Sequence, residues 1–146
     1  MEHIFSLNID WTGGRNGIGN LAARDLNTEV SIPFEMNGPN VGTNPDEMLL
    51  GASATCYIIT LAMLLEKHRI NVQSLSVASE ATVDVTNGIY TFKEILHKPH
   101  IVTGLLEERL VRKVEQLAMR AEETCMISKA LKGNVGIHVQ LLHEMR

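Results

Sequence analysis

Residues 43–69 read TNPDEMLLGASATCYIITLAMLLEKHR, and they begin with a clear helix start signal. Asn44 is a good N-cap residue, and Pro45 suits the first helical position because its missing N–H would be unpaired there anyway. Glu47 follows three residues after the cap, as in a capping box. Asp46 and Glu47 also place negative charge at the positive end of the helix dipole. The sequence therefore predicts a helix that begins at Pro45.

This helix has no charged residue between Met48 and Leu65, so no face of it is patterned for water. A helix that is apolar all round is buried in a protein core or in lipid. Polar and small residues within it lower its hydropathy, which disfavours a membrane span: Gly51, Ser53, Thr55 and Thr60. We therefore predict a central helix buried on all sides, in which residues 51–54 permit close approach of another helix.

The composition indicates one globular domain over residues 1–146, with 45% hydrophobic residues and a net charge of −4. One Trp, two Tyr and three Phe offer few stacking platforms, and there is no basic patch, so a nucleic-acid partner is not expected. The N-terminus has no basic segment followed by an apolar run, so we expect no signal peptide, and no membrane partner is expected. Only two cysteines, Cys56 and Cys125, predict a reducing cytoplasmic location.

Before the helix, the sequence predicts short strands. Residues 3–11 alternate weakly, and Asn16-Gly17 is a strong hairpin signal. Residues 21–24 continue the second strand, and residues 29–33 form a third. The glycines of this region do not make a phosphate-binding loop, because no helix start and no Lys-Ser/Thr pair follows them.

After the helix, residues 72–86 and 89–102 alternate around Asn87-Gly88, which predicts a second hairpin. An apolar stripe predicts an amphipathic helix over residues 105–123. A short helical turn over 124–131 and a last strand over 135–142 complete the chain. The order of strands and helices predicts the α+β class.

Three sequence motifs, taken together, are specific enough to indicate a protein family. Thr43-Asn44-Pro45 precedes an acidic residue, and Cys56 lies twelve residues after Asn44. Residues 125–131 read CMISKAL after an amphipathic helix, and residues 11–17 read WTGGRNG. In these motifs and in element order, essentially the whole chain resembles the peroxide-reducing OsmC/Ohr family.

The resemblance implies a fold of antiparallel sheets packed around long central helices, assembled as an interlocked homodimer. It implies a cysteine-based peroxidase for organic hydroperoxides, with no metal or organic cofactor. Cys56 would attack the peroxide, Cys125 would resolve the product as a disulfide, and Arg15 would hold the Cys56 thiolate. A dithiol, such as the lipoyl group that serves relatives, would be the reductant.

The chain departs from the family pattern at two positions. The carboxylate that pairs with the arginine is usually a Glu after Asn-Pro, and here it falls on Asp46, with Glu47 beside it. Aspartate is one methylene shorter, so the ion pair to Arg15 is looser or passes to Glu47. The usual Pro after the second cysteine is Met126.

The chemistry can also be argued from the residues. A thiolate is the nucleophile in peroxide reduction, and burial among apolar side chains would raise the pKa of Cys56. Arg15 is the best cation in the sequence to reverse that shift. Attack would leave a sulfenic acid that a second thiol can trap. Cys125 lies near the start of a short helix, whose dipole favours its thiolate.

The alternative is that Cys56 is only a small buried hydrophobe, as most buried cysteines are. The chain would then be a non-catalytic OsmC-like protein with a stress-related or small-molecule-binding role. Six scattered histidines and the lack of a Cys-x-x-Cys motif disfavour metal binding, and His97 and His100 would point to opposite faces of a strand. Ser128 and Lys129 are assigned to helix geometry.

Overall fold

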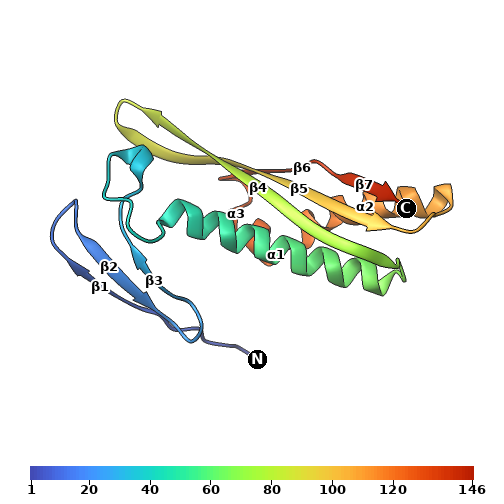
Figure 1. Ribbon diagram of the computed structural model, residues 1–146, viewed down its shortest axis with the longest axis horizontal. Helices are drawn as coiled ribbons and strands as arrows, with labels where there is room; N and C mark the ends of the chain where they lie inside the picture. Colours follow the sequence, from blue (N-terminus) through green and yellow to red (C-terminus); the bar gives the residue numbers. More distant parts are fainter. The chain divides into compact units, whose positions relative to one another are not determined.

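The computed structural model describes residues 1–146, and the chain divides into two units, Met1–Met48 and Leu49–Arg146. The first unit is a three-stranded antiparallel sheet of β1 (Asn8–Thr12), β2 (Ile18–Ala22) and β3 (Asn27–Val30), followed by the 3₁₀ turn η1 (Phe34–Met36) (Figure 1). The strands agree with the predicted ones in order, although β1 is shorter. The single domain over 1–146 stays a prediction.

The first hairpin is present, but its turn differs from the predicted one. Thr12 pairs with Ile18, so residues 13–17 form the loop, and Gly17 N–H donates to Gly14 O at 3.0 Å. Gly13, not Asn16, has the positive φ, at 99°. Gly17 is required by close approach, because an added Cβ would lie 2.4 Å from Thr12 O. The glycine-rich tract therefore folds the strands back on each other.

Helix α1 spans Pro45–Lys67, as the start signal predicted. Asn44 Oδ1 accepts a hydrogen bond from Glu47 N–H at 2.9 Å, which confirms the N-cap. The reciprocal half of the capping box is absent, because the Glu47 carboxylate accepts from Thr43 Oγ1 at 2.8 Å. Glu47, one of the two predicted partners of Arg15, is thus hydrogen-bonded to Thr43 at the start of the helix.

The second unit contains a long hairpin of β4 (Val72–Thr86) and β5 (Ile89–Thr103). Its turn residues Asn87 and Gly88 have φ of 53° and 74°, as a type I′ turn requires, so this turn was predicted correctly. The single last strand predicted over 135–142 is wrong. The chain forms β6 (Gly136–Val139) and β7 (Leu142–Met145), and both pair with β5 in parallel.

The parallel pairing follows from the connection, because parallel strands need a long crossover and the helices between β5 and β6 supply it. These helices are α2 (Glu108–Thr124) and α3 (Met126–Leu131). The α+β class with antiparallel sheets is confirmed, and β6 and β7 make the second sheet mixed.

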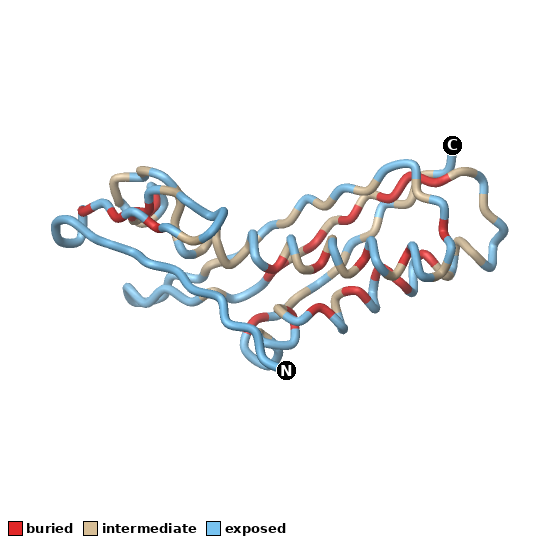
Figure 2. The backbone as a smooth tube through the Cα atoms, turned by 90° about the horizontal axis from the view of Figure 1, so that it is seen from below, coloured by how far each residue is buried: buried red, intermediate tan, exposed pale blue.

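The core of the second unit lies between α1, β5 and α2, and Figure 2 shows the buried positions following these elements. Apolar side chains from all three elements and from the loop after α1 share one cluster. Its fully or nearly fully buried members are Tyr57, Leu61, Leu65, Ile70, Ile101, Val114, Leu117 and Ala121.

Within one chain, α1 is buried on one face only. The prediction that this helix is buried on all sides is therefore wrong for the single chain. The buried residues recur every four positions, as Ser53, Tyr57, Leu61 and Leu65. On the opposite face, Ile59 is 54% exposed and Met63 is 64% exposed. The helix is long and apolar enough to span a membrane, with 22% of its most apolar window buried. The core helix of a soluble protein passes the same test.

Candidate functional site

The second unit brings the two cysteines together. Cys56 lies in α1, and Cys125 lies at the junction of α2 and α3, where its N–H donates to Ala121 O at 3.0 Å. Cys125 is also the N-cap of α3, because its Sγ accepts a hydrogen bond from Ser128 N–H at 3.5 Å. The Cys125 thiol lies close enough to Cys56 to lower the pKa of that thiol through a hydrogen-bonding interaction. Two thiols far apart in sequence are therefore direct neighbours.

The surroundings of Cys56 favour its thiolate. Partial burial by itself would raise the pKa of Cys56, but hydrogen bonds overcome this effect and leave the pKa below the ordinary value. The groups that lower the pKa are the Cys125 thiol, then the backbone N–H groups of Ile127 and Met126. The Thr60 hydroxyl has the smallest effect, and it donates to the Cys56 backbone oxygen at 2.8 Å. The start of α3 thus acts on Cys56 as well as on Cys125, where the sequence placed its effect.

Cys125 has the opposite character. Complete burial raises its pKa, and the neighbouring Cys56 raises it further, while the N–H and hydroxyl of Ser128 lower it in part. The start of α3 favours the Cys125 thiolate, as its position in the sequence indicated, but desolvation outweighs this effect and the pKa of Cys125 lies above its ordinary value. Of the two thiols, Cys56 therefore loses its proton more readily, and Cys125 keeps its proton to higher pH.

Arg15 belongs to the first unit, where carbonyl groups hold its guanidinium. It donates to Met36 O at 2.6 Å, to Asn37 O at 3.2 Å and to Asn16 Oδ1 at 3.0 Å. It forms no ion pair with Asp46 or Glu47, although both belong to the same unit. The roles given to Arg15, Asp46 and Glu47 stay predictions.

A buried polar group near the cysteines was missed by sequence reasoning. His97 of β5 lies between Ser53 Oγ, 3.2 Å from Nε2, and Ser79 Oγ, 2.7 Å from Nδ1. The ring of Tyr57 stacks on the imidazole, with centroids 4.7 Å apart. Burial lowers the pKa of His97 to about 4, so the ring is neutral at pH 7. This group joins α1 to the sheet one turn before Cys56.

Thr60 and the α3 amides are the other contributors that sequence reasoning missed. Thr60 lies four residues after Cys56, on the same side of α1, and that spacing could have indicated it. The amides of Met126 and Ile127 carry no sequence signal, because every residue has the same group.

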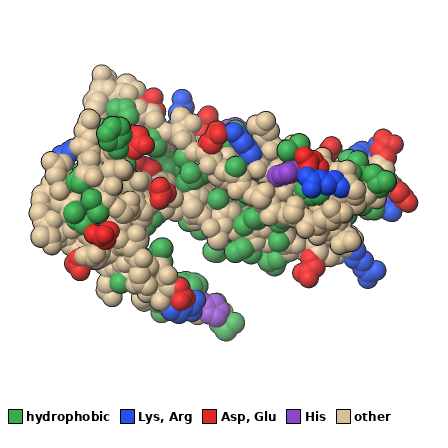
Figure 3. Space-filling model, viewed as in Figure 1, with side chains coloured by type: hydrophobic (Ala, Val, Ile, Leu, Met, Phe, Trp, Pro, Cys, Tyr) green, Lys and Arg blue, Asp and Glu red, His purple; other side chains and the backbone are tan.

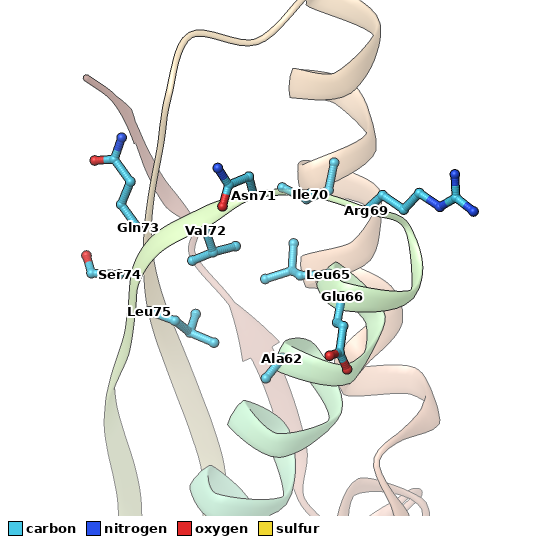
Figure 4. A pocket seen from close by; sticks show the side chains of 10 residues that line it. All are labelled: Ala62, Leu65, Glu66, Arg69, Ile70, Asn71, Val72, Gln73, Ser74 and Leu75. Carbon is cyan, nitrogen blue, oxygen red and sulfur yellow. The ribbon is translucent and has the colours of Figure 1, made fainter.

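Two hollows of the second unit have no cysteine in their lining. One of about 540 Å³ lies at the C-terminal end of α1, where Glu66 and Arg69 are its charged residues (Figure 4). Another, of about 490 Å³, is lined by the end of α2, by α3 and by the start of β6. No group of three or more His, Cys, Asp or Glu side chains is placed to hold a metal ion.

Comparison with known proteins gives consistent matches. A model of the OsmC-like protein family matches residues 38–140. The uncharacterized protein YmaD of Bacillus subtilis is 45% identical over 140 residues, covering 95% of this chain and 93% of its own. The organic hydroperoxide resistance protein of Xanthomonas axonopodis is 24% identical, covering 94% of both chains. A solved organic hydroperoxide resistance protein from Legionella pneumophila has a TM-score of 0.74 and 26% identity, covering 96% of this chain and 98% of its own.

Proposed function

The chain belongs to the OsmC-like family, and from that premise we propose that it is a thiol-dependent peroxidase that reduces organic hydroperoxides. Relatives named for organic hydroperoxide resistance support this activity at the level of the family. The observation that carries the proposal is the contact between two thiols of opposite character, Cys56 with a lowered pKa and Cys125 with a raised one.

In the oxidising half of the reaction, the Cys56 thiolate attacks the outer oxygen of the hydroperoxide. The O–O bond breaks, the alkoxide takes a proton and leaves as an alcohol, and Cys56 becomes a sulfenic acid. Cys125 then attacks the Cys56 sulfur and releases water, which forms the Cys56–Cys125 disulfide. Because the thiols are in contact, this step competes well with further oxidation of the sulfenic acid.

In the reducing half, an external dithiol opens the disulfide by thiol exchange. Its first thiolate forms a mixed disulfide with the protein, and its second thiol releases the reduced cysteine. The substrate preference for organic hydroperoxides is supported by the apolar side chains around Cys56. Ile59 follows one turn later in α1, and Met126 lies at the start of α3, and both are exposed.

Arg15 is the cation of this proposal, and Asp46 or Glu47 is the carboxylate that orients it. Its guanidinium would supply charge to Cys56 in addition to the hydrogen bonds that already lower the pKa of that thiol. Arg15 would therefore strengthen a thiolate that its neighbours already favour, and it would not create the thiolate by itself.

A homodimer is part of the proposal. Hydrophobic side chains gather on the surface along α1, where one chain leaves Ile59 and Met63 exposed (Figure 3). Gly51 has no atom near the position of an added Cβ, so the start of this face is open to another helix. A second copy would cover this apolar surface, which would promote aggregation if it stayed exposed to water. We place the protein in the cytoplasm, where two free thiols stay reduced.

The experiment is peroxide consumption with dithiothreitol as reductant and cumene hydroperoxide as substrate. We expect steady turnover by the unchanged protein, none by Cys56→Ser, and a single turnover followed by a stall for Cys125→Ser. Hydrogen peroxide should be consumed more slowly than cumene hydroperoxide. Normal turnover by Cys56→Ser would refute the activity, and a protein that never consumes peroxide would favour the non-catalytic alternative.

A further inference from the structure

The hydroxyl of Ser128 is buried without a hydrogen-bond partner. Ser128 is 4% exposed, and its Oγ is one of two buried side-chain atoms for which no partner is present. The other is His100 Nε2, and it lies 3.4 Å from Glu144 Oε2. Unsatisfied buried hydroxyls are uncommon in folded proteins because they cost free energy. The Ser128 hydroxyl therefore needs an explanation beyond the helix geometry that the sequence indicated.

The neighbour of this hydroxyl is the Cys125 sulfur. Ser128 N–H donates to Cys125 Sγ at 3.5 Å, and the Ser128 hydroxyl also favours the Cys125 thiolate. In the resting protein Cys125 is a thiol, and a thiol sulfur accepts hydrogen bonds only weakly. A thiolate accepts them strongly. The hydroxyl is thus placed beside an atom that becomes a good acceptor only when it carries negative charge.

The exposures of the two cysteines determine when that charge arises. Cys125 is fully buried, whereas Cys56 is partly exposed. A reducing thiolate can therefore reach the sulfur of Cys56 but not that of Cys125. Its attack forms a bond to Cys56 Sγ and breaks the bond between the two cysteines, and the electron pair stays on Cys125. The rate of such exchange depends on how well the leaving thiolate is stabilised.

We propose that Ser128 is a catalytic residue of the reducing half-reaction, whose hydroxyl donates a hydrogen bond to the departing Cys125 thiolate. The inference rests on the proposed Cys56–Cys125 disulfide. Ser128 N–H and Oγ–H then form a two-donor site for the leaving sulfur inside the protein. The direction of reduction follows, with the mixed disulfide always on Cys56 and the thiolate always on Cys125.

The test starts from the disulfide made with diamide, so it does not require peroxide chemistry. Reopening by excess dithiothreitol is followed by quenched-flow thiol labelling for the unchanged protein and for Ser128→Ala, Ser128→Thr and Thr124→Val. Thr124 is the matched control, because its hydroxyl donates to Arg120 O at 2.8 Å and lies next to Cys125 in sequence. Loss of one hydrogen bond to a developing thiolate should slow reopening roughly tenfold in Ser128→Ala. Ser128→Thr and Thr124→Val should stay within about threefold of the unchanged protein, a limit set by the context dependence of such contacts.

A second readout separates this role from a structural one. In a Cys56→Ser background, Ser128→Ala should raise the pKa of Cys125, and Ser128→Thr should restore it, as measured by the ultraviolet absorbance of the thiolate as a function of pH. Equal reopening rates for the unchanged protein and Ser128→Ala would overturn the inference, as would equal slowing by Thr124→Val. Failure of diamide to form the disulfide would also overturn it.

The outcomes for the two proposals are distinct. A disulfide that forms with diamide but not with cumene hydroperoxide overturns the peroxidase, while slower reopening by Ser128→Ala in the same protein still supports the role of Ser128. A disulfide that forms with both oxidants, and reopens equally fast in Ser128→Ala, overturns the role of Ser128 alone.

Discussion

Protonation of His97 should weaken the packing of α1 on the sheet. The loss in unfolding free energy follows from the pKa of His97. Burial lowers the pKa of His97 to about 4 from an ordinary value of 6.5. The unfolded chain therefore binds more protons than the folded one between these values, so stability is present above pH 6.5 and is lost as the pH falls toward 4. A shift of this size is worth about 3 kcal/mol. That is a large share of the stability of a typical domain.

The assay is urea unfolding, followed by circular dichroism at fixed protein concentration, between pH 7.5 and pH 4. His97→Gln is the matched variant, because an amide can donate to one serine and accept from the other but does not titrate in this range. Other groups contribute to the same curve, since burial lowers the pKa of His143 and raises the pKa of Glu122. These groups are common to both proteins, so the difference between the two curves isolates His97.

We expect the unchanged protein to lose about 3 kcal/mol more than His97→Gln over this interval. The variant should be less stable at pH 7 because it lacks the ring that stacks on Tyr57. Parallel stability curves for the two proteins would refute the reasoning, because they would mean that His97 takes up its proton equally well when folded.

Three further predictions concern the N-cap of α1, the proposed dimer and the role of Arg15. Asn44→Ala should cost about 1 kcal/mol of unfolding free energy through the lost cap, whereas Asn44→Asp should be nearly neutral, and equal losses in urea unfolding would contradict the cap's role. Met63→Glu should turn the proposed dimer into monomer in sedimentation equilibrium, while Leu105→Glu, which is 85% exposed outside α1, should not; an unchanged Met63→Glu dimer would place the interface elsewhere. Arg15→Met should raise the pKa of Cys56 in alkylation rate profiles, with Arg24→Met, whose guanidinium pairs with Asp25, as control; identical profiles would remove Arg15 from the mechanism.

Local signals predicted the fold where the chemistry of a few residues is decisive. The start of α1 follows from Asn44 and Pro45, and the long hairpin follows from Asn87-Gly88, since only certain residues tolerate those backbone angles. The last strand was less predictable. Its division into β6 and β7 depends on pairing with β5, which is a tertiary contact and leaves no local pattern.

The buried face of α1 could not be predicted for a related reason. A helix that is apolar all round has no periodic pattern to indicate which side faces its own sheet. In the structure, Tyr57 and Leu61 are buried against the core, whereas Ile59 and Met63 on the opposite face are exposed.

The candidate site was predicted through resemblance and not through pattern. Cys56 and Cys125 are far apart in sequence, and no local rule brings them together. From the sequence, only Arg15 was assigned to stabilise the Cys56 thiolate, because the effect of the amides at the start of α3 depends on the fold. His97 was hidden among six histidines, since its meaning depends on Ser53 and Ser79 from other elements.

The most direct test of the thiol pair is mass spectrometry of the reduced protein after one equivalent of cumene hydroperoxide. We expect that both free thiols disappear, that each chain loses two hydrogens, and that digestion yields one peptide pair joined between Cys56 and Cys125. Two intact thiols after this treatment, or a disulfide that joins Cys56 to Cys56 of another chain, would contradict it.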